Sequence, residues 1–342
     1  MRRISTMDGS ATAAGETAAW QLWVDTGGTF TDCLALAPGG RVRRLKVLSN
    51  GALRGRVTAV GDSRTVEIEL PHQLPDGFLD GAELVLLDGS QRAPVATSRA
   101  PGRLTLETPI DARPGQRCEL RTGEEAPVLA ARLATGTPPG AELPPISMRL
   151  ATTRATNALL ERSGSPTALF ITRGFGDLVE IGTQQRPDLF ALRVRKRRPF
   201  YSAVVEVDER LAADGEVLVP LDERALAAAA AESVGEGISS AAVAFLHSYR
   251  DARHEAAARR ILAAAGFRHV SCSAELAPLI RLLPRAETAI VDAYLSAVIE
   301  TYLAAVSAAV GSGRLRVMTS AGGLQSVAGF RPKESLLSGP AG

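Results

Sequence analysis

The chain has 342 residues, 45% of them hydrophobic and 22% charged, which is enough for two or three folded domains with ordinary cores. Its net charge of +2 gives no global attraction to nucleic acid or membranes, and the basic run Arg193–Arg198 is interpreted as a solvated loop. The three cysteines and four histidines lack the spacing of a zinc site or a disulfide framework.

Residues 1–18 are small and polar, so we expect them to form a disordered tail rather than a signal peptide. Every apolar run of about 20 residues is interrupted by charges, so we expect no membrane span. Widely separated cysteines fit a reducing compartment. Together these features predict a cytoplasmic protein.

The first predicted element is a hairpin within residues 19–40, in which Trp20–Val24 and Cys33–Ala37 are apolar strands around a Gly-Gly turn. Residues 41–125 then carry short β-type runs that are separated by Gly, Pro and Asp, at 56–60, 65–70, 84–87, 104–107 and 118–120. Short strands at such spacing predict a small β-sandwich or barrel-like module, inserted into a larger domain.

From residue 126 onward strand and helix signals alternate, which predicts an α/β architecture. We expect helices at 127–134, 156–162, 175–180, 221–234, 253–265 and 285–310, and strands at 147–151, 167–172, 240–246, 269–273 and 315–319. Capping signals support three of the helices: Leu221-Asp222 precedes one, Gly266 follows another, and Gly311 ends the longest.

The glycine turn, which we define as Asp25–Asp32 with the sequence Asp-Thr-Gly-Gly-Thr-Phe-Thr-Asp, carries the strongest chemical signal. Glycines permit positive φ and a close approach to a ligand, and successive backbone N–H groups form an anion-binding nest. Three threonines add hydroxyl donors, and the two carboxylates suit a hydrated Mg²⁺ or a water molecule. An ordinary hairpin turn is the plain alternative, but the flanking polar residues favour a phosphate-binding turn. It is not a P-loop, because no GxxxxGK[ST] is present.

Val24–Asp32 resembles the N-terminal signature of the hydantoinase A/5-oxoprolinase family. Further blocks resemble the same family in the same order, at Ala151–Arg162, Thr172–Asp177, Glu180–Gly182, Arg186–Leu189, Ala244–Tyr249, His254–Glu255, Arg285–Ala289, Ser320–Gly323 and Leu337–Gly342.

The resemblance implies an α/β fold of the actin-like ATPase (ribonuclease H-like) type, here its N-terminal half with an inserted small β-rich module. Residues 19–40 would be the first phosphate-loop hairpin of the hydantoinase/oxoprolinase N-terminal domain, 41–125 the insertion, and 126–315 the remainder of that domain. Residues 316–342 would be the truncated start of the hydantoinase A core domain.

The resemblance also implies an enzyme that uses ATP and Mg²⁺ to open a small cyclic amide, as a 5-oxoprolinase or hydantoinase does, by phosphoryl transfer to the lactam oxygen. It implies an oligomer with a hydantoinase B-type subunit or fused domain, and no nucleic-acid or membrane partner. The alternatives are an ATP-dependent ketone carboxylase subunit of the same family, a non-catalytic subunit-assembly module, and a small-sugar kinase.

The site residues expected from the turn and the resemblance fall into three groups. Asp25 and Asp32 are the expected catalytic residues, Asp25 also holding Mg²⁺ through water, and the nucleotide phosphates are expected at Thr26, Gly27, Gly28, Thr29 and Thr31. The substrate is expected at Thr153, Arg154, Asn157 and Arg173.

Each of several polar residues also has a purely structural interpretation. Thr153 or Thr156 would cap a helix, and Arg173 would form an ion pair with Asp177. His247 is interpreted as a core or strand-end residue rather than a general base, and Cys33 as a core residue rather than a nucleophile.

The actin-like superfold places a second phosphate loop opposite the first, again with the pattern Asp-x-Gly-Gly-Thr. The nearest match, Ala321–Leu324, lacks both the Asp and the Thr. We therefore expect a fragment that lacks the second loop and the adenosine pocket, and that is inactive alone.

Overall fold

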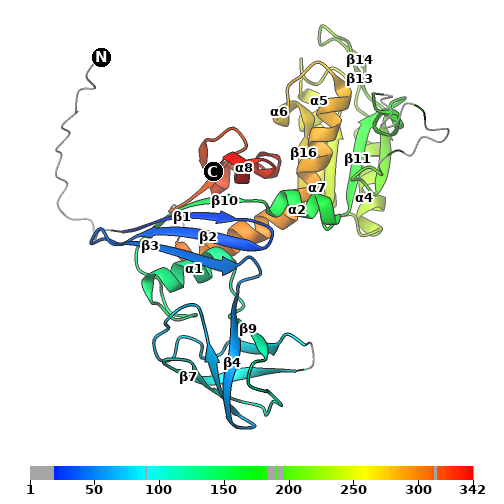
Figure 1. Ribbon diagram of the computed structural model, residues 1–342. Coiled ribbons are helices and arrows are strands. Elements are labelled where there is room, and N and C mark those ends of the chain that lie inside the picture. The colour runs from blue at the N-terminus through cyan, green and yellow to red at the C-terminus, as the bar shows by residue number, and fades with distance from the viewer. Residues whose placement is uncertain are drawn as a thin grey trace, which may run out of the picture. The chain divides into compact units, whose positions relative to one another are not determined.

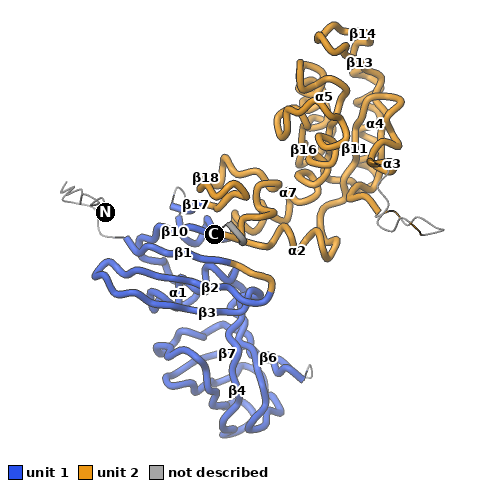
Figure 2. Tube along the Cα trace, turned by 45° about the horizontal axis from the view of Figure 1, so that its top comes forward, with its two compact units in different colours: residues 1–25, 29–150, 306–316 blue, residues 26–28, 151–305, 317–342 orange. Residues whose placement is uncertain are grey.

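A computed structural model describes residues 19–88, 91–183, 190, 196, 198–311 and 314–341. The tail 1–18, the block Arg186–Leu189 and most of the basic run Arg193–Arg198 lie outside the described residues. The chain divides into two compact units, which are coloured separately in Figure 2. Unit 1 comprises Met1–Asp25, Thr29–Leu150 and Val306–Arg316, and unit 2 comprises Thr26–Gly28, Ala151–Ala305 and Val317–Gly342.

Unit 1 contains a sheet in which five of the six strands lie in the order β17-β10-β1-β2-β3, and Figure 1 labels β10, β1, β2 and β3 of this sheet. These strands are β1 (Trp20–Thr26), β2 (Phe30–Leu36), β3 (Val42–Leu48), β10 (Ile146–Thr152) and β17 (Leu315–Met318). One face buries Leu22, Val24 and Ala35. The helix α1 (Ala126–Thr135) packs against β2 and β3, where Arg43 donates to the carbonyl of Ala134 at 2.8 Å.

The predicted β-rich module is confirmed as a closed antiparallel barrel of order β4-β5-β8-β7-β6-β9. Its strands are β4 (Ala52–Asp62), β5 (Thr65–Glu69), β6 (Glu83–Leu86), β7 (Arg92–Arg99), β8 (Arg103–Leu106) and β9 (Arg117–Arg121). Closure leaves no strand edge unpaired. The strand β3 falls within the range 41–125 that was expected for the module, but it pairs with β2.

Unit 2 contains a parallel sheet of order β12-β11-β15-β16. The strands are β11 (Thr167–Thr172), β12 (Ala203–Val207), β15 (Ser240–Ala244) and β16 (His269–Cys272). The helices α4 (Glu223–Gly235) and α5 (Arg253–Ala265) cover one face, and α6 (Ser273–Leu276) and α7 (Leu282–Val310) cover the other. Coverage on both faces explains why β11 and β15 are buried throughout. The predicted α/β architecture is confirmed.

The helix α7 is the longest element, and it begins three residues before the predicted Arg285. It is long and apolar enough to span a membrane, but 61% of its apolar window is buried, as in the core helix of a folded domain. Tyr294 of α7 packs closely against Gly164, because a Cβ on Gly164 would lie 2.2 Å from the Tyr294 ring.

Shorter elements complete unit 2. They are α2 (Arg154–Glu161), α3 (Leu178–Ile181), the hairpin β13 (Arg210–Leu211) and β14 (Val217–Val219), β18 (Leu324–Ser326), the 3-10 turns Val327–Gly329 and Pro332–Ser335, and α8 (Ser338–Ala341). The helix predicted from Phe175 begins only at Leu178, because Phe175 forms a turn with Thr172.

Candidate functional site

The glycine turn is shared between the two units: Thr26–Gly28 belong to unit 2, whereas Asp25 and Thr29–Asp32 belong to unit 1. In unit 2, Thr26 is buried, and its carbonyl accepts from the backbone N–H of Thr153 at 2.8 Å and from the Thr153 hydroxyl at 3.2 Å. The hydroxyl of Tyr302 on α7 donates to the Thr26 hydroxyl at 3.1 Å. The predicted phosphate ligand Thr26 is therefore held inward by its side chain.

Gly28 does not adopt the positive φ that glycine permits, because its backbone lies outside the left-handed region. Space is the reason for glycine here. A Cβ on Gly28 would lie 3.3 Å from the side-chain nitrogen of Asn157. The predicted substrate residue Asn157 therefore lies directly beside the exposed backbone of Gly28.

The junction between β10 and α2, Thr152–Asn157, holds this side of the turn. The hydroxyl of Thr152 accepts from the Arg154 N–H at 3.1 Å, whereas Thr153 makes no capping bond and Thr156 donates to the carbonyl of Leu336 at 2.8 Å. Capping by Thr153 or Thr156 is therefore the wrong explanation, because both hydroxyls bind segments distant in sequence. The Arg154 guanidinium stacks over the Tyr302 ring at 5.2 Å.

The segment 335–339 packs onto the same junction. The buried hydroxyl of Ser338 donates to the carbonyl of Thr152 at 2.8 Å. A Cβ on Gly339 would lie 2.9 Å from Cγ2 of Thr153, so glycine is needed for this approach. Sequence reasoning missed the roles of Tyr302 and Ser338, although both lie in segments it singled out, the four-residue apolar spacing of α7 and the terminal family block.

In unit 1, the side chains of the turn follow the alternation of β1 and β2. Thr31 is fully buried and its hydroxyl shares a hydrogen bond of 3.1 Å with Ser49, so it too faces inward. Asp25 and Asp32 are at exposed positions, and Asp32 pairs with Lys46 at 3.2 Å.

Burial, and then the nearby Asp32 carboxylate, raise the pKa of Asp25. A divalent cation would relieve this repulsion, and two exposed carboxylates are oxygen ligands of the kind that a hydrated Mg²⁺ accepts. Among the described residues, no group of three or more His, Cys, Asp or Glu side chains could hold a metal ion.

Arg173 does not share contacts with the residues around Thr26–Gly28. It follows β11, and its Nε lies 2.6 Å from the Asp208 carboxylate, while its carbonyl accepts from Arg210 at 2.9 Å. The alternative pairing with Asp177 is wrong, because Asp208 takes that place. The structure thus brings Thr153, Arg154 and Asn157 to the turn and places Arg173 at the carboxyl end of the parallel sheet.

Two other candidates have structural positions away from the turn. Cys33 is buried and burial raises its pKa to about 12, which fits a core residue and not a nucleophile. His247 is half-buried and lies just beyond the end of β15 with φ of 59°, and its Nδ1 has no hydrogen-bond partner among the described residues.

Arg285 is a buried residue whose role the sequence did not predict. It is fully buried, donates to the carbonyl of Phe245 at 2.8 Å and to the hydroxyls of Ser248 and Ser273, and lies 3.6 Å from the Glu255 carboxylate.

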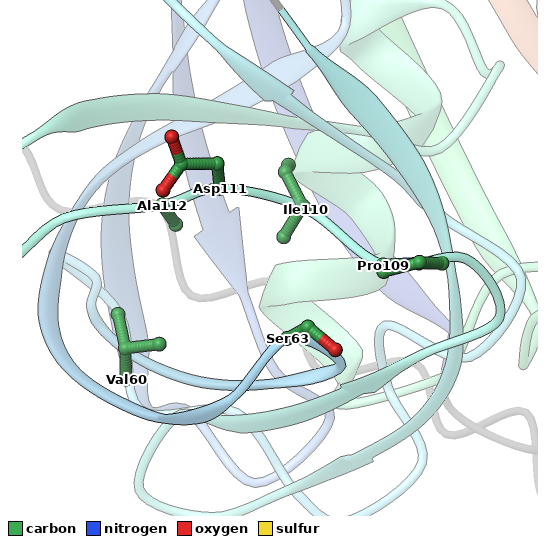
Figure 3. Close-up of a pocket in the computed structure, with 6 residues that line it drawn as sticks. All are labelled: Val60, Ser63, Pro109, Ile110, Asp111 and Ala112. Carbon is green, nitrogen blue, oxygen red and sulfur yellow. The ribbon is translucent and has the colours of Figure 1, made fainter.

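Two hollows lie away from the turn. One, of about 430 Å³, is at the barrel and is shown in Figure 3. Its polar lining atoms are the hydroxyl of Ser63 and the carboxylate of Asp111, and the latter pairs with Arg113. The other is a groove of about 630 Å³ in unit 2, between α7 and residues 319–336.

Comparison with known proteins finds two family models that match parts of this chain. Residues 139–266 match the Hydantoinase/oxoprolinase N-terminal region, and residues 285–342 match Hydantoinase/oxoprolinase. The chain is 40% identical to 5-oxoprolinase 1 of Arabidopsis thaliana over 218 residues, which are 57% of this chain and 17% of that protein. It is 38% identical to the 5-oxoprolinase of Saccharomyces cerevisiae over 226 residues, 57% of this chain and 18% of that one.

Two further likenesses concern caprolactamase and acetone carboxylase. The chain is 32% identical to caprolactamase subunit alpha of Pseudomonas jessenii over 164 residues, which are 46% of this chain and 23% of the subunit. The structure of the ATP-dependent caprolactamase from that organism matches with a TM-score of 0.58 at 24% identity, and nucleotide-free acetone carboxylase with 0.55 at 20%. Each covers 94% of this chain and 39% of the other, and both show the fold alone.

The chain thus spans less than a fifth of the length of these two 5-oxoprolinases. Two family regions match in consecutive order within residues 139–342, and they include the junction and the segment that hold the glycine turn. This chain therefore belongs to the hydantoinase/oxoprolinase family.

Proposed function

We propose that this chain is the N-terminal part of an ATP-dependent cyclic-amide hydrolase of the 5-oxoprolinase or hydantoinase type. Relatives named 5-oxoprolinase and caprolactamase support the reaction class. The observation that carries the proposal is the glycine turn itself, whose backbone is held by Thr153 and flanked by Asn157.

Some residues of the turn fix its shape, and others would bind the ligand. The hydroxyls of Thr26 and Thr31 are bonded inside the protein, so they fix the shape of the turn. The backbone N–H groups around Gly27 and Gly28, with the exposed Thr29, would then bind the ATP phosphates. Asp25 and Asp32 would hold Mg²⁺ through water, and Arg154 and Asn157 would position the substrate.

When bound, ATP supplies the phosphoryl group that makes the amide carbonyl attackable by water, and Mg²⁺ neutralises the charge that develops. A five-membered lactam is a poor electrophile, which is why activation is needed. The chain's own contribution is to position these groups and to stabilise charge, since phosphoryl transfer requires little else.

The test is ³¹P NMR of ATP with the folded chain, in the presence and absence of Mg²⁺. We expect the β- and γ-phosphate signals to broaden or shift with Mg²⁺, and Asp25→Asn to weaken the effect. Glu232→Asn, a carboxylate-to-amide change at an exposed position on α4, is the control. Unperturbed ATP signals with folded wild-type protein would contradict the proposal and favour a non-catalytic assembly module.

The wider assignments are also proposals. They are an actin-like ATPase fold with the domain boundaries given above, a cytoplasmic location, an oligomer, and a hydantoinase B-type partner or fused domain. The name of the caprolactamase relative, a subunit alpha, supports a partner. We further propose that this chain is inactive alone, and ATP-dependent phosphate release with 5-oxoproline or hydantoin would refute that statement.

The carboxylase alternative has weaker support than the hydrolase. Acetone carboxylase matches at 20% identity, which supports a shared fold, whereas the two 5-oxoprolinases match at 38% and 40%. A substrate screen with the complete enzyme, comparing cyclic amides with acetone plus bicarbonate, separates the two.

A further inference from the structure

The groove of unit 2 combines an apolar wall with charges of both signs. Pro284 and Val291 of α7 and Leu336 of the facing segment supply the apolar surface. Glu287, Lys333 and Glu334 supply the charges. Its volume of about 630 Å³ is within the range of small-molecule sites.

Glu287 and Lys333 supply the two charges that a ligand can meet. The Glu287 side chain is exposed and makes no hydrogen bond or ion pair with the part of the chain that the structure describes. The Lys333 ammonium lies 3.9 Å from the Glu334 carboxylate, which is the outer limit of an ion pair, so its three donors remain available. Both side chains are about one quarter exposed.

The walls of the groove are fixed by buried hydrogen bonds. The backbone N–H of Lys333 donates at 3.0 Å to Asp292, a buried carboxylate that also accepts from Ser271 at 2.8 Å. The Ser320 hydroxyl donates to the carbonyl of Glu334 at 2.6 Å. With its amide oriented to satisfy both neighbours, Gln325 donates to the Glu334 carboxylate at 3.1 Å. A ligand would meet a preformed surface.

These features select a ligand class. Two carboxylates and one ammonium suit a molecule that carries both an amine and a carboxylate, with methylenes between them for the apolar wall. A neutral lactam offers neither charge. Hydrolysis adds one water across the C–N bond of a lactam and yields a carboxylate and an ammonium in one molecule. We propose that this groove binds an amino acid of that kind, the ring-opened form of a cyclic amide, with its carboxylate at Lys333 and its ammonium at Glu287.

The groove is connected to the glycine turn through one short segment. Leu336 lines the groove, and its carbonyl accepts from Thr156 in the junction that holds Thr26. An amino acid in the groove would therefore contact a segment that packs against the proposed phosphate site. The identity of the ligand as a reaction product rests on the proposed function, but its binding does not.

The experiment is isothermal titration of the chain with glutamate and 6-aminohexanoate. Caprolactam lacks both charges, glutarate lacks the amine, and pentylamine lacks the carboxylate, so these are the comparison ligands. We expect the amino acids to bind about tenfold or more tightly than any of the three. Glu287→Gln and Lys333→Met should each weaken amino-acid binding about tenfold. Glu232→Gln and Arg224→Gln, at exposed positions on α4, should leave it unchanged.

Three results would overturn the proposal: no heat with any amino acid up to about 10 mM, equal binding by the groove variants and wild type, or heat from MgCl₂ alone that the groove variants abolish. Thermal unfolding checks that the variants fold. The ATP signals test the proposed function separately, because Glu287→Gln should leave them unchanged. Amino-acid binding without ATP perturbation would refute the proposed function and retain the groove.

Discussion

Arg285 and Glu255 form a buried ion pair in which Arg285 depends on Glu255 more than Glu255 depends on Arg285. The Glu255 carboxylate accepts from the N–H groups of Phe245 at 3.0 Å and Ala274 at 2.8 Å, and from the hydroxyls of Ser248 and Ser273. It keeps these four donors if Arg285 is removed. The guanidinium of Arg285, by contrast, has no other carboxylate among its described partners, and its Nε is buried without a partner.

The expected costs follow from this asymmetry. Glu255→Gln leaves a buried guanidinium without its counter-charge, which costs about 3–5 kcal/mol of unfolding free energy. Arg285→Met leaves a carboxylate that is still hydrogen-bonded, and the loss should be about 1–3 kcal/mol. The double variant should be more stable than Glu255→Gln alone, because the uncompensated charge is gone.

Urea denaturation followed by far-UV circular dichroism is the suitable assay. The chain has two tryptophans, Trp20 and Trp23, and both are in unit 1, so fluorescence would report the wrong unit. The helical signal reports α4, α5 and α7. Arg224→Met, at an exposed position, should change stability by no more than about 0.5 kcal/mol. If Arg285→Met costs more than Glu255→Gln, or the double variant shows no rescue, the reasoning is refuted.

Three further predictions concern the turn and the core. Tyr302→Phe removes a hydrogen bond to the turn and should weaken Mg-ATP binding, measured by ³¹P NMR, about 2- to 10-fold. The control Tyr249→Phe should not weaken it, and equal effects of the two variants would contradict a positioning role for Tyr302. The pKa of Asp25 is raised on folding, so its stabilising contribution is complete below about pH 3.9 and is lost as pH rises through the folded value. At neutral pH the charged carboxylate is therefore unfavourable in the folded state, and Asp25→Asn should raise the unfolding temperature. An unchanged or lower unfolding temperature by differential scanning fluorimetry would contradict this. Gly164→Ala places a methyl group against the Tyr294 ring and should cost about 1–3 kcal/mol in urea denaturation, with no loss counting against the close approach.

The helices of unit 2 were predictable because their signals are local. The predicted range 253–265 is the observed α5, and Gly266 follows it with φ of 110°. Asp222 caps α4 as predicted, since its carboxylate accepts from the Ala225 N–H at 2.9 Å. An apolar stripe at helical spacing and a capping residue at one end need no knowledge of the rest of the chain.

Two of the strands that the sequence did not predict, β3 and β7, lack the same kind of signal. In β3 a charged residue, Arg43, is on the inward side and the apolar Val42 is exposed, which hides the alternation of a strand. In β7 the residue Pro94 argues against a strand, yet it is tolerated because its carbonyl accepts from Glu107 at 2.9 Å and no donor is required of it.

The candidate site was predictable in its residue types and not in its contacts. The glycine turn is a single stretch, so its chemistry can be read directly. Its supports come from far away: Tyr302 is 276 residues from Thr26, and Ser338 is 186 residues from Thr152. Nothing in a single sequence specifies such pairs. For the same reason the sequence did not show that the Thr31 hydroxyl faces inward, where it bonds to Ser49.

The barrel leaves and rejoins its host at neighbouring positions, because the first strand β4 pairs with the last strand β9, Ala52 opposite Arg121. Just outside this pair, Gly51 is so close to the Glu124 carbonyl that a Cβ would lie 2.1 Å from it. For the rest of unit 1, the host of the barrel, the whole barrel therefore takes the place of a tight turn between β3 and α1. The barrel strands begin and end at adjacent positions, so by loop-closure scaling a connection of about 70 residues costs the host a few kcal/mol of chain entropy at most. The length of this region can therefore change while the glycine turn and its supports stay as they are.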